Sequence, residues 1–439
     1  MQKLTIHNFG PIQDCEVIIK DFTVLIGPQS SGKSTISKLT FFFLNLRENA
    51  IDFILNELDT PNPKLNFNNF TKQIRKRFLE FWGPIPNAKD LFIKFEYGED
   101  TSVEIKLDDQ RHKFVTPRFS NNIINAMREA YQSFKDMGIG QNSIPSLFAT
   151  PNMINQERTR TKIITSLKSE FGKLFQFDKE LFFIPAGRSL LSTISDQLQY
   201  IHPHQLDYPM RQFIERINAT KAFFNKSFDD IIRERHVLEK SVTHRGTLEK
   251  AGKIINRILK AEYRHDKDGG KIYIGDGKYT KINFASSGQQ ESVWILLSLF
   301  LILLEKVDAF IFIEEPEAHL FPIAQKQMVS LICYVANVQN CKFMITSHSP
   351  YILSAINNHV YASVVGKLRE KEVDNIIPKK EWLNHKRIDG FLVDEGSTTA
   401  LYDEDLKMLK TELVDSASDI VNTEYDELFT IENSDQKEC

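Results

Sequence analysis

The sequence is poor in cysteine and tryptophan and has no hydrophobic run long enough to cross a membrane. Its four cysteines include no CxxC pair, which argues against a zinc site or a disulfide framework and favours a reducing compartment. The longest apolar run, VWILLSLFLILL at 293–304, falls short of the about 20 residues that a membrane helix needs, so it predicts a buried core helix. The N-terminal MQKLTIHNFG has no apolar signal-peptide core. We therefore expect a cytoplasmic protein with no membrane partner.

Internal repeats and low-complexity stretches are also absent, and 41% hydrophobic with 26% charged residues is a globular composition. The length of 439 residues suggests about three domain-sized units. The net charge of −3 hides an asymmetry, because residues 391–439 carry 14 acidic and 3 basic side chains. Residues 1–390 carry 52 basic and 44 acidic side chains, which suits a polyanionic partner such as DNA. The alternative is that the acidic segment is only a solvated helix.

Strand and helix patterns alternate near both ends of the chain. Apolar runs that predict strands lie at 4–9, 17–26, 181–185, 309–313 and 342–346. Helical patterns follow at 34–46, 287–305, 322–338 and from Pro350 onward. This alternation predicts an α/β fold whose parallel sheet is assembled from the two ends of the chain, with other segments inserted between them.

Residues 27–34, GPQSSGKS, fit the phosphate-binding pattern GxxxxGK[ST] and lie between an apolar strand and a predicted helix. Glycines allow backbone amides to wrap phosphate groups, and the helix N-terminus adds partial positive charge. Lys33 would reach the β- and γ-phosphates of a nucleotide, and the Ser34 hydroxyl would bind Mg²⁺. A chance Gly/Ser turn before a helix is the alternative. The residues expected to bind nucleotide here are Gly27, Ser30, Gly32, Lys33, Ser34 and Thr35.

A second motif, FIFIEEPE at 310–317, is an apolar strand that ends in carboxylates. Such a strand delivers its acids to the C-terminal edge of the sheet, where ligands bind in open α/β folds. We expect Glu314 to hold the Mg²⁺ shell through water and Glu315 to act as general base on the attacking water. His348 follows a later strand, from which it would contact the γ-phosphate or that water. A solvated acidic turn and a structural histidine are the alternatives.

The segment FASSGQQE at 284–291 opens the apolar helix. Its small residues leave backbone amides free at a helix N-terminus, which makes a second anion site. One chain cannot place this segment and the phosphate loop on the same γ-phosphate if the helical insertion separates them, whereas two chains arranged head to tail can. The pattern therefore favours a homodimer.

These four motifs, in this order, resemble those of ABC-type ATPase heads, and most closely the RecF/SMC/OLD-like branch. NFG at 8–10 and EAHL at 317–320 also match that branch. The resemblance covers roughly residues 1–46, 181–200 and 270–365. It implies an ABC-type P-loop ATPase head with a parallel sheet core, an antiparallel β lobe and an inserted helical subdomain, and it implies ATP and Mg²⁺ as ligands.

In that family two heads sandwich two ATP molecules, each held by the phosphate loop of one chain and the signature segment of the other. By this resemblance Ser286, Gly288 and Gln289 would act in trans on the ATP of a partner chain. The implied assembly is a homodimer closed by ATP, with a higher homo-oligomer as an extension.

The sequence departs from the branch at several points. Gln29 stands where the branch often has Asn, and the signature ASSGQ lacks the double glycine of transporters. Glu314 replaces the more usual Asp, and its longer reach changes the metal geometry, so we expect slow hydrolysis. The Q-loop residue is left open among Arg188, Gln197 and Gln199, which all follow the expected strand.

We divide the chain into six segments. They are 1–116, the first part of the head with the phosphate loop and β lobe; 117–180, a helical insertion; 181–200, a core strand and the Q-loop region; 205–268, a helical hairpin; 269–365, the rest of the head; and 366–439, a C-terminal extension with an acidic helical tail. Residues 211–265 hold 13 basic and 7 acidic side chains. The candidates for following a DNA backbone are Arg233, Arg235, Arg257 and Lys260, unless they form an ordinary solvated face.

The triplet Asp403-Glu404-Asp405 looks like the acidic motif of the Toprim nuclease domain that full-length OLD proteins carry after the ATPase. The nearest preceding acid on a predicted strand, Glu395, is too close in sequence to complete such a site. We therefore expect an acidic helical tail over 400–439 and no nuclease activity of its own. Near-helical spacing of apolar residues in this tail predicts a helix that mediates assembly; they are Leu406, Leu409, Leu413, Ile420 and Val421.

Stand-alone heads of this kind resemble the ATPase subunits of prokaryotic anti-phage systems such as Septu and PARIS. The resemblance implies a sensor or regulatory ATPase that controls a separate nuclease effector. A RecF-like ATPase of DNA repair and recombination is the main alternative. A transporter ATPase subunit and an ATP-gated scaffold are further alternatives.

Overall fold

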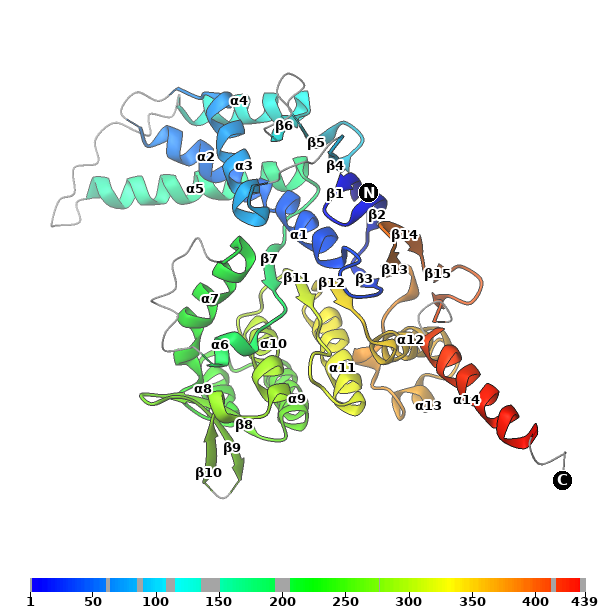
Figure 1. Cartoon of the computed structure of the whole chain (residues 1–439). Coiled ribbons are helices and arrows are strands. Elements are labelled where there is room, and N and C mark those ends of the chain that lie inside the picture. The colour runs from blue at the N-terminus through cyan, green and yellow to red at the C-terminus, as the bar shows by residue number, and fades with distance from the viewer. Residues whose placement is uncertain are drawn as a thin grey trace.

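A six-stranded sheet forms the centre of the molecule (Figure 1). The computed structural model describes residues 2–60, 64–84, 90–107, 115–135, 151–193, 206–275, 277–411 and 416–434. The strand order is β14-β13-β3-β12-β11-β7, in which β14 is antiparallel and all other pairs are parallel. The strands are β3 (Phe22–Ile26), β7 (Glu180–Ile184), β11 (Ala309–Glu314), β12 (Lys342–Ser347), β13 (Ile388–Asp394) and β14 (Ser397–Ala400). The predicted α/β class with a parallel sheet built from both chain ends is confirmed.

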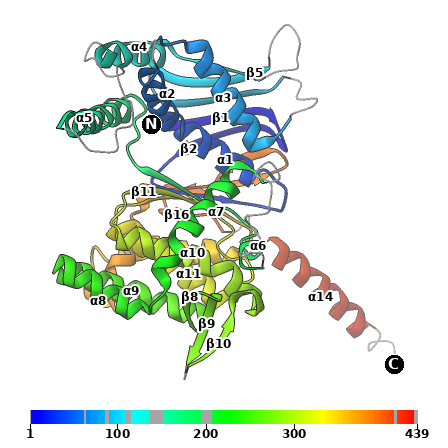
Figure 2. The ribbon, with the colours of Figure 1, turned by 90° about the vertical axis from the view of Figure 1, so that its left-hand side faces the viewer.

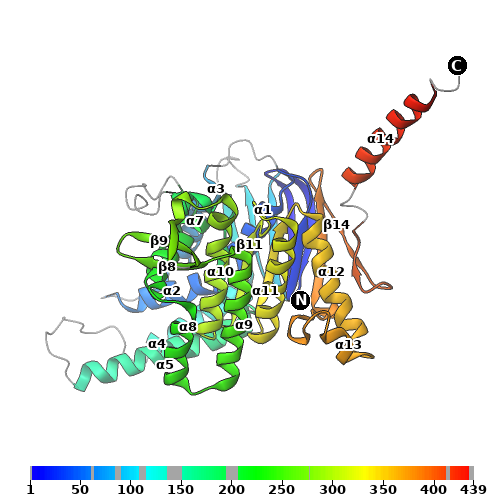
Figure 3. The ribbon, with the colours of Figure 1, turned by 90° about the horizontal axis from the view of Figure 1, so that it is seen from below.

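Both faces of this sheet are buried, because alternate residues of its strands enter two different hydrophobic cores. In β11, Ile311 and Ile313 belong to the core formed with α9 (Val242–Leu259), α10 (Ser287–Leu304), α11 (Pro322–Val338) and α12 (Pro350–Val365). Phe310 and Phe312 face the opposite core, which contains α1 (Lys33–Leu44). Figure 3 shows α9, α10, α11 and α12 side by side across the first face.

The apolar run at 293–304 is the core helix that the sequence predicts. α10 is the one helix in the described part of the chain that is long and apolar enough to cross a membrane, and 72% of its residues are buried within the molecule. It packs against α9 and α11. Its hydrophobicity is therefore accounted for by the core of the protein.

An antiparallel lobe covers the α1 side of the sheet (Figure 2). Its order is β2-β1-β4-β5-β6, with β1 (Gln2–Phe9), β2 (Ile12–Ile19), β4 (Phe92–Gly98), β5 (Thr101–Leu107) and β6 (Val115–Phe119). The single strand predicted over 17–26 is two strands, because the chain turns at Lys20, whose amide bonds the Thr23 hydroxyl at 3.3 Å, and enters the other sheet. The boundary predicted after residue 116 falls inside β6, which pairs with β5 and extends the lobe to Phe119.

Helices α2 (Leu46–Leu58), α3 (Phe67–Trp82), α4 (Asn121–Lys135) and α5 (Pro151–Leu174) flank this lobe. The abundant phenylalanines concentrate here. Phe41 of α1 makes edge contacts with Phe183 of β7 and Phe312 of β11, at ring distances of 5.2 and 5.5 Å. Phe42 makes an edge contact with Phe78 of α3 at 5.5 Å. Aromatic packing thus fastens α1, which carries the phosphate loop, to the sheet and to the lobe.

The predicted two-helix hairpin over 205–268 is wrong. The described residues there form three helices, α7 (Tyr208–Thr220), α8 (Phe228–Glu239) and α9, followed by the first strand of a small antiparallel sheet. The breaks occur where Ser227 and Ser241 act as side-chain N-caps and start new helices. The small sheet consists of β8 (Glu262–Asp266), β9 (Gly269–Gly275) and β10 (Lys278–Lys281).

The C-terminal extension is partly integral to the head, which corrects the boundary predicted at residue 366. β13 pairs in parallel with β3, so that Ile388 lies beside Phe22 and Leu392 beside Ile26. The expected helical tail over 400–439 instead begins with the short hairpin of β15 (Tyr402–Asp403) and β16 (Met408–Leu409). Helix α14 (Ser416–Ser434) follows and projects away from the body in all three views (Figures 1–3).

Candidate nucleotide-binding site

The five parallel strands end at one edge of the sheet, and the predicted motifs lie directly after three of them. β3 leads into the phosphate loop, β11 ends in Glu314, and β12 precedes His348. The strand register places Ser347 beside Ile26 and Thr346 beside Glu314. The carboxyl edge of a parallel sheet is where open α/β folds bind ligands. Segments from distant parts of the chain therefore meet here.

The phosphate loop requires glycine at two positions. Gly27 has φ +150°, and a Cβ there would lie 2.1 Å from the carbonyl oxygen of Val393 in β13. Gly32 has φ +110°, and a Cβ there would lie 2.2 Å from Ile12 Cδ1. α1 then begins at Lys33 without a side-chain N-cap, which leaves the amides of its first turn available to an anion.

Lys33 is almost fully buried beneath its own loop. Its ammonium donates to the carbonyl oxygens of Gly27 at 2.9 Å and Pro28 at 2.5 Å. Burial lowers the pKa of Lys33, and this shift is opposed by Glu315 and Glu317. The side chain of Ser34 is exposed beside it, whereas Thr35 is half-buried. The ammonium is thus held by carbonyl groups that phosphate oxygens can replace.

His348 connects Lys33 to Glu315. Its Nε2 lies 3.0 Å from Glu315 Oε1, and its Nδ1 lies 3.0 Å from the Gly27 carbonyl oxygen and 3.3 Å from Lys33 Nζ. The His348 amide and the Ser347 hydroxyl donate to Glu317 Oε1 at 2.7 and 2.8 Å. The structure therefore brings the phosphate loop, the acidic motif and the late histidine into one hydrogen-bonded group.

Glu314 is buried, and one of its two carboxylate oxygens accepts no hydrogen bond from the described residues. Its Oε2 accepts from the Ala186 amide at 3.1 Å, whereas Oε1 has no hydrogen-bond partner among the described residues. Burial raises the pKa of Glu314, and Lys38, the Ala186 amide and the Ser34 hydroxyl oppose this shift. A buried carboxylate oxygen without a partner is costly unless a ligand binds it.

These donors fit the protein's share of a Mg²⁺ site. Mg²⁺ keeps several waters and takes further ligands from substrate phosphates, so it needs few protein side chains. Ser34 and Glu314 supply a hydroxyl and a carboxylate next to the phosphate loop. Across the described ranges, no cluster of three or more His, Cys, Asp or Glu side chains is arranged to hold a metal ion without such help.

The signature segment lies at the N-terminus of α10. Ser286 is exposed and caps the helix, in a capping box with Gln289. The Gln289 Nε2 also donates to the Leu259 carbonyl oxygen at 2.8 Å, so this side chain is engaged within its own chain. A Cβ on Gly288 would lie 2.7 Å from the His319 carbonyl oxygen, which packs this segment against the EAHL loop. Within the described part of the chain, the segment shares no hydrogen bond with the phosphate loop.

Several residues of this region were missed by sequence reasoning. Lys38 of α1 pairs with Asp207 at 2.5 Å, next to Glu314. Glu317 binds the His348 backbone, as described above.

Of the three Q-loop candidates, Arg188 is fully buried and bonds to backbone carbonyls, which leaves it unable to act as a Q-loop contact to nucleotide. The other two candidates, Gln197 and Gln199, lie outside the described residues.

The acidic triplet at 403–405 has a structural role. Asp403 Oδ1 accepts from the amides of Asp405 and Leu406 at 3.0 and 2.9 Å, which closes the turn between β15 and β16. Lys410 lies 3.8 Å from the same carboxylate. Asp403 thus shapes the turn between β15 and β16.

The four basic candidates for DNA contact divide into two pairs. Arg235 forms ion pairs with Glu239 at 2.6 Å and Glu305 at 3.2 Å, and Arg233 lies 3.5 Å from Asp230. Arg257 and Lys260 are exposed on α9 and at its C-cap. Arg235 is held by two carboxylates, whereas Arg257, Lys260 and the 71% exposed side chain of Arg233 remain accessible to a phosphate backbone.

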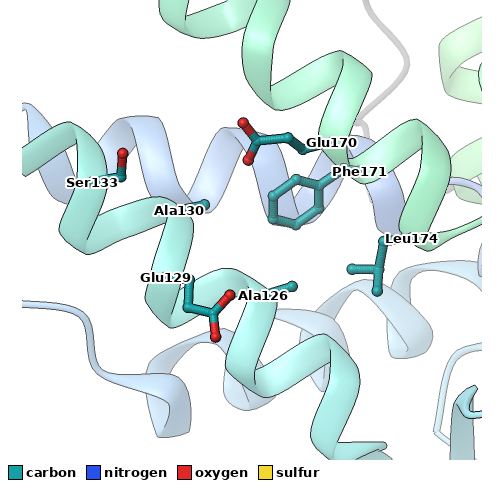
Figure 4. Close-up of a pocket in the computed structure, with 7 residues that line it drawn as sticks. All are labelled: Ala126, Glu129, Ala130, Ser133, Glu170, Phe171 and Leu174. Carbon is teal, nitrogen blue, oxygen red and sulfur yellow. The ribbon is translucent and has the colours of Figure 1, made fainter.

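Two hollows lie away from the sheet edge. A pocket of about 210 Å³ lies between α4 and α5, with Glu129 and Glu170 among its lining residues (Figure 4). A groove of about 980 Å³ is lined by residues of α1, α2, α5, β7 and α7, among them Arg47 and Arg216. Neither is lined by the phosphate loop, Glu315 or His348.

Comparison with known proteins agrees with this site. The model of the family described as AAA ATPase domain matches residues 1–353. A curated relative, OLD nuclease from Thermus scotoductus, is 22% identical over 387 residues, which cover 85% of this chain and 63% of the relative. The chain thus spans less than two thirds of that relative's length.

Two solved structures of SMC heads also match. One, an SMC head bound to the C-terminal winged-helix domain of ScpA, covers 91% of this chain at 12% identity with a TM-score of 0.38. The SMC head from Thermotoga maritima covers 91% at 14% identity with a TM-score of 0.35. Because the family model spans residues 1–353, which include the phosphate loop, Glu315 and His348, the chain belongs to the AAA ATPase domain family.

Proposed function

We propose that this chain binds ATP with Mg²⁺ at the sheet edge and hydrolyses it slowly. The observation that carries this proposal is the contact series Lys33–His348–Glu315, which joins a phosphate-binding cation to a carboxylate through an imidazole. Phosphoryl transfer depends on positioning and electrostatic stabilisation, and these groups supply both.

Each residue has a role in this proposal. Lys33 and the first-turn amides of α1 bind the β- and γ-phosphates, and Thr35 and Ser30 line the same loop. Ser34 and Glu314 hold Mg²⁺, which when bound offsets the negative charge of the phosphates. Glu315 accepts the proton of the attacking water. His348 orients the Glu315 carboxylate through its 3.0 Å contact and moves toward the γ-phosphate when Lys33 is drawn to it.

We further propose that a second chain completes the site, with Ser286, Gly288 and the backbone of Gln289 facing the partner's ATP. Two large apolar side chains support this arrangement, because they flank the close contact between Gly288 and the His319 carbonyl. Phe284 is 76% and Phe321 is 73% exposed. Exposed apolar groups beside a helix N-terminus gain from burial against another head.

The biological role that we propose is that of a cytoplasmic sensor or regulatory ATPase subunit in a prokaryotic anti-phage system, which controls a separate nuclease effector. The curated relative is named a nuclease. The turn-forming role of Asp403 supports assigning cleavage to another polypeptide.

A RecF-like role in DNA repair is the second candidate. The exposed Arg257 and Lys260 favour it, because basic side chains that form no ion pair with the described residues suit a phosphate backbone. Reversal of both charges should abolish DNA binding if this candidate is correct. The same charge reversal should leave protection against phage unchanged if the anti-phage role is correct.

A phage-challenge assay tests the proposed role. Cells carrying this gene together with the genes that adjoin it should form fewer plaques, and Glu315→Gln should remove that protection. Sensitivity to DNA damage without any effect on plaques would favour the repair role. The pure protein should not cut plasmid DNA in Mg²⁺, and cleavage that Asp403→Ala abolishes would contradict a separate nuclease.

A further inference from the structure

Arg188, the residue four positions after β7, is buried without exposure in the middle of the head. Its Nη1 donates to the carbonyl oxygens of Pro185 at 2.7 Å and Glu314 at 2.6 Å, and its Nη2 donates to that of Glu315 at 2.9 Å. A guanidinium is costly to bury unless its donors are satisfied. Here two of these three hydrogen bonds go to the backbone of the acidic motif.

The other end of the same contact set lies on α10. Arg188 Nε donates to the Glu291 carbonyl oxygen at 2.9 Å. The carboxylate of Glu291, itself 3% exposed, accepts from the amides of Arg188 and Ser189, both at 3.0 Å. A further hydrogen bond joins the same two segments, because the Ser192 hydroxyl donates to the Gln290 carbonyl oxygen at 3.1 Å. The first turns of α10 are therefore fastened to the segment that holds Glu315.

Glu315 has a backbone conformation that is sensitive to such support. Its φ is +46°, in the left-handed region that a residue with a side chain adopts at a cost. The surrounding contacts must hold it there, and the Glu315 carbonyl is bound by Arg188. A shift of α10 along its axis would move Glu291, then Arg188, and so change the position of Glu315.

We infer that Arg188 is a positioning residue that couples the signature segment at the start of α10 to Glu315 of the same chain. This inference rests on the proposed ATP-closed dimer. There, the signature of one chain contacts ATP held by its partner, whereas Glu315 acts on ATP held by its own chain. Arg188 thus connects the two ATP sites, so that hydrolysis at each depends on occupancy of the other.

Such coupling has a kinetic signature that a purely structural arginine lacks. Turnover by the wild-type protein should depend on ATP concentration with a Hill coefficient above 1, with an upper limit of about 2 for two sites. In Arg188→Lys, which keeps the charge but loses the forked geometry, the coefficient should fall to 1. The kcat should fall at least about tenfold, while ATP binding through Lys33 is unchanged.

The matched control is Arg47→Lys. Arg47 is also buried, at 5% exposure, and donates to the Phe177 and Lys179 carbonyl oxygens at 2.6 and 3.3 Å, but it makes no hydrogen bond to α10. It should lower thermal stability without changing the Hill coefficient. Glu291→Gln provides a second perturbation of the same junction from α10, and it should reproduce the loss of cooperativity if Arg188→Lys fails to fold.

The outcomes separate this inference from the proposed function. Wild-type protein without turnover that depends on Glu315 would contradict the proposed function itself. Wild-type turnover that is non-cooperative, or cooperativity that survives in both Arg188→Lys and Glu291→Gln, would overturn the coupling role alone. Loss of cooperativity in Arg47→Lys as well would show that general destabilisation is the cause.

Discussion

The nucleotide site and helix α14 differ in how well the chain's own contacts account for them. At the sheet edge, Lys33, His348 and one oxygen of Glu317 have partners within the chain, whereas the second oxygen of Glu317 and one oxygen of Glu314 have none among the described residues. Along α14, residues 421–432 are all exposed. The contacts within the first region account for the chemistry proposed there, the hydrolysis of ATP. The second leaves apolar side chains exposed along α14, which is the kind of surface that a partner or a second copy of the chain could cover.

The largest effect is expected from Glu315→Gln, which removes the proposed base and keeps the shape of the side chain. Turnover should fall by about 10²–10⁴-fold, because that is the usual contribution of general base catalysis. ATP binding should persist, and the ATP-closed dimer should accumulate, since hydrolysis no longer opens it. Phosphate release and native mass measure the two effects. Glu372→Gln, on an exposed face of α13 (Glu370–Asp374), is the control, and undiminished release from Glu315→Gln would show that Glu315 is not the base.

Lys33→Ala should weaken ATP binding at the same site. Loss of charge-assisted hydrogen bonds to phosphate costs about 2–3 kcal/mol, which corresponds to roughly a 30- to 150-fold rise in Kd. Calorimetric titration with ATP and Mg²⁺ measures this change. Lys72→Ala, an exposed lysine of α3, should leave the Kd unchanged. Wild-type affinity in Lys33→Ala would refute the phosphate-loop assignment.

Gly27→Ala tests how closely β13 packs on the phosphate loop. The added Cβ would meet the Val393 carbonyl oxygen at 2.1 Å in a backbone conformation that favours glycine, so the variant should lose about 2–4 kcal/mol of stability. Urea denaturation measures the loss. Gly246→Ala on α9 has open space around it and should instead gain about 0.5–1 kcal/mol, because alanine favours helices. Equal stability of the two variants would contradict the close approach of β13.

Much of the nucleotide site could be predicted because each part is a short motif directly after an apolar strand. Gly27 and Gly32 belong to one short motif, and Glu314 and Glu315 are adjacent in another, so each motif can be recognised from its local sequence. The contacts between motifs could not be predicted in the same way. Arg188 bonds Glu315 across 127 residues, and Glu317 bonds the His348 amide across 31 residues. No local pattern encodes which distant carbonyl a buried guanidinium will reach.

The same limit applies to the fold. Strands β3, β11 and β12 are mostly apolar because both of their faces are buried, and this made them recognisable. β13 contains Gly390 and ends in Asp394, so its local sequence does not predict a central strand. Its place beside β3 is set by long-range pairing, and Gly390 packs closely on Leu409, because a Cβ there would approach Leu409 Cδ2 at 2.9 Å.

Acid should destabilise the head through His359 of α12. Burial lowers the pKa of His359 from its usual 6.5, and its Nδ1 lies 2.9 Å from the Glu381 carbonyl oxygen. The folded state therefore keeps this ring neutral while the unfolded chain takes up a proton, so stability falls as pH drops below 6.5. His359→Gln should reduce that slope, by at most about 1.4 kcal/mol per pH unit. Urea midpoints between pH 7.5 and 5.5 measure the slope of stability against pH, and His319→Gln is the exposed control. An unchanged slope in His359→Gln would contradict the role of His359.

The smallest effect on the head is expected from removing α14. Val421, Tyr425, Leu428 and Phe429 lie at helical spacing on one side of this helix and are 55–66% exposed. A chain that stops at Thr411 keeps the buried Leu401 and Leu409 of the β15–β16 region. It should therefore keep its ATP turnover and change Tm by less than about 2 °C, while its native mass falls or its co-purifying partner is lost.

Two comparisons make this prediction specific to the apolar side of α14. A chain that stops at Ala400 removes Leu401 and Leu409 as well, and should lose stability because those side chains leave the core. In the full chain, Leu428→Glu with Phe429→Glu should reproduce the loss of assembly, whereas Asn422→Glu leaves the apolar side intact and should not. If the chain that stops at Thr411 keeps both its mass and its partner, α14 has no part in assembly. If it aggregates or melts early, α14 packs on its own head in solution, which would contradict a role in assembly.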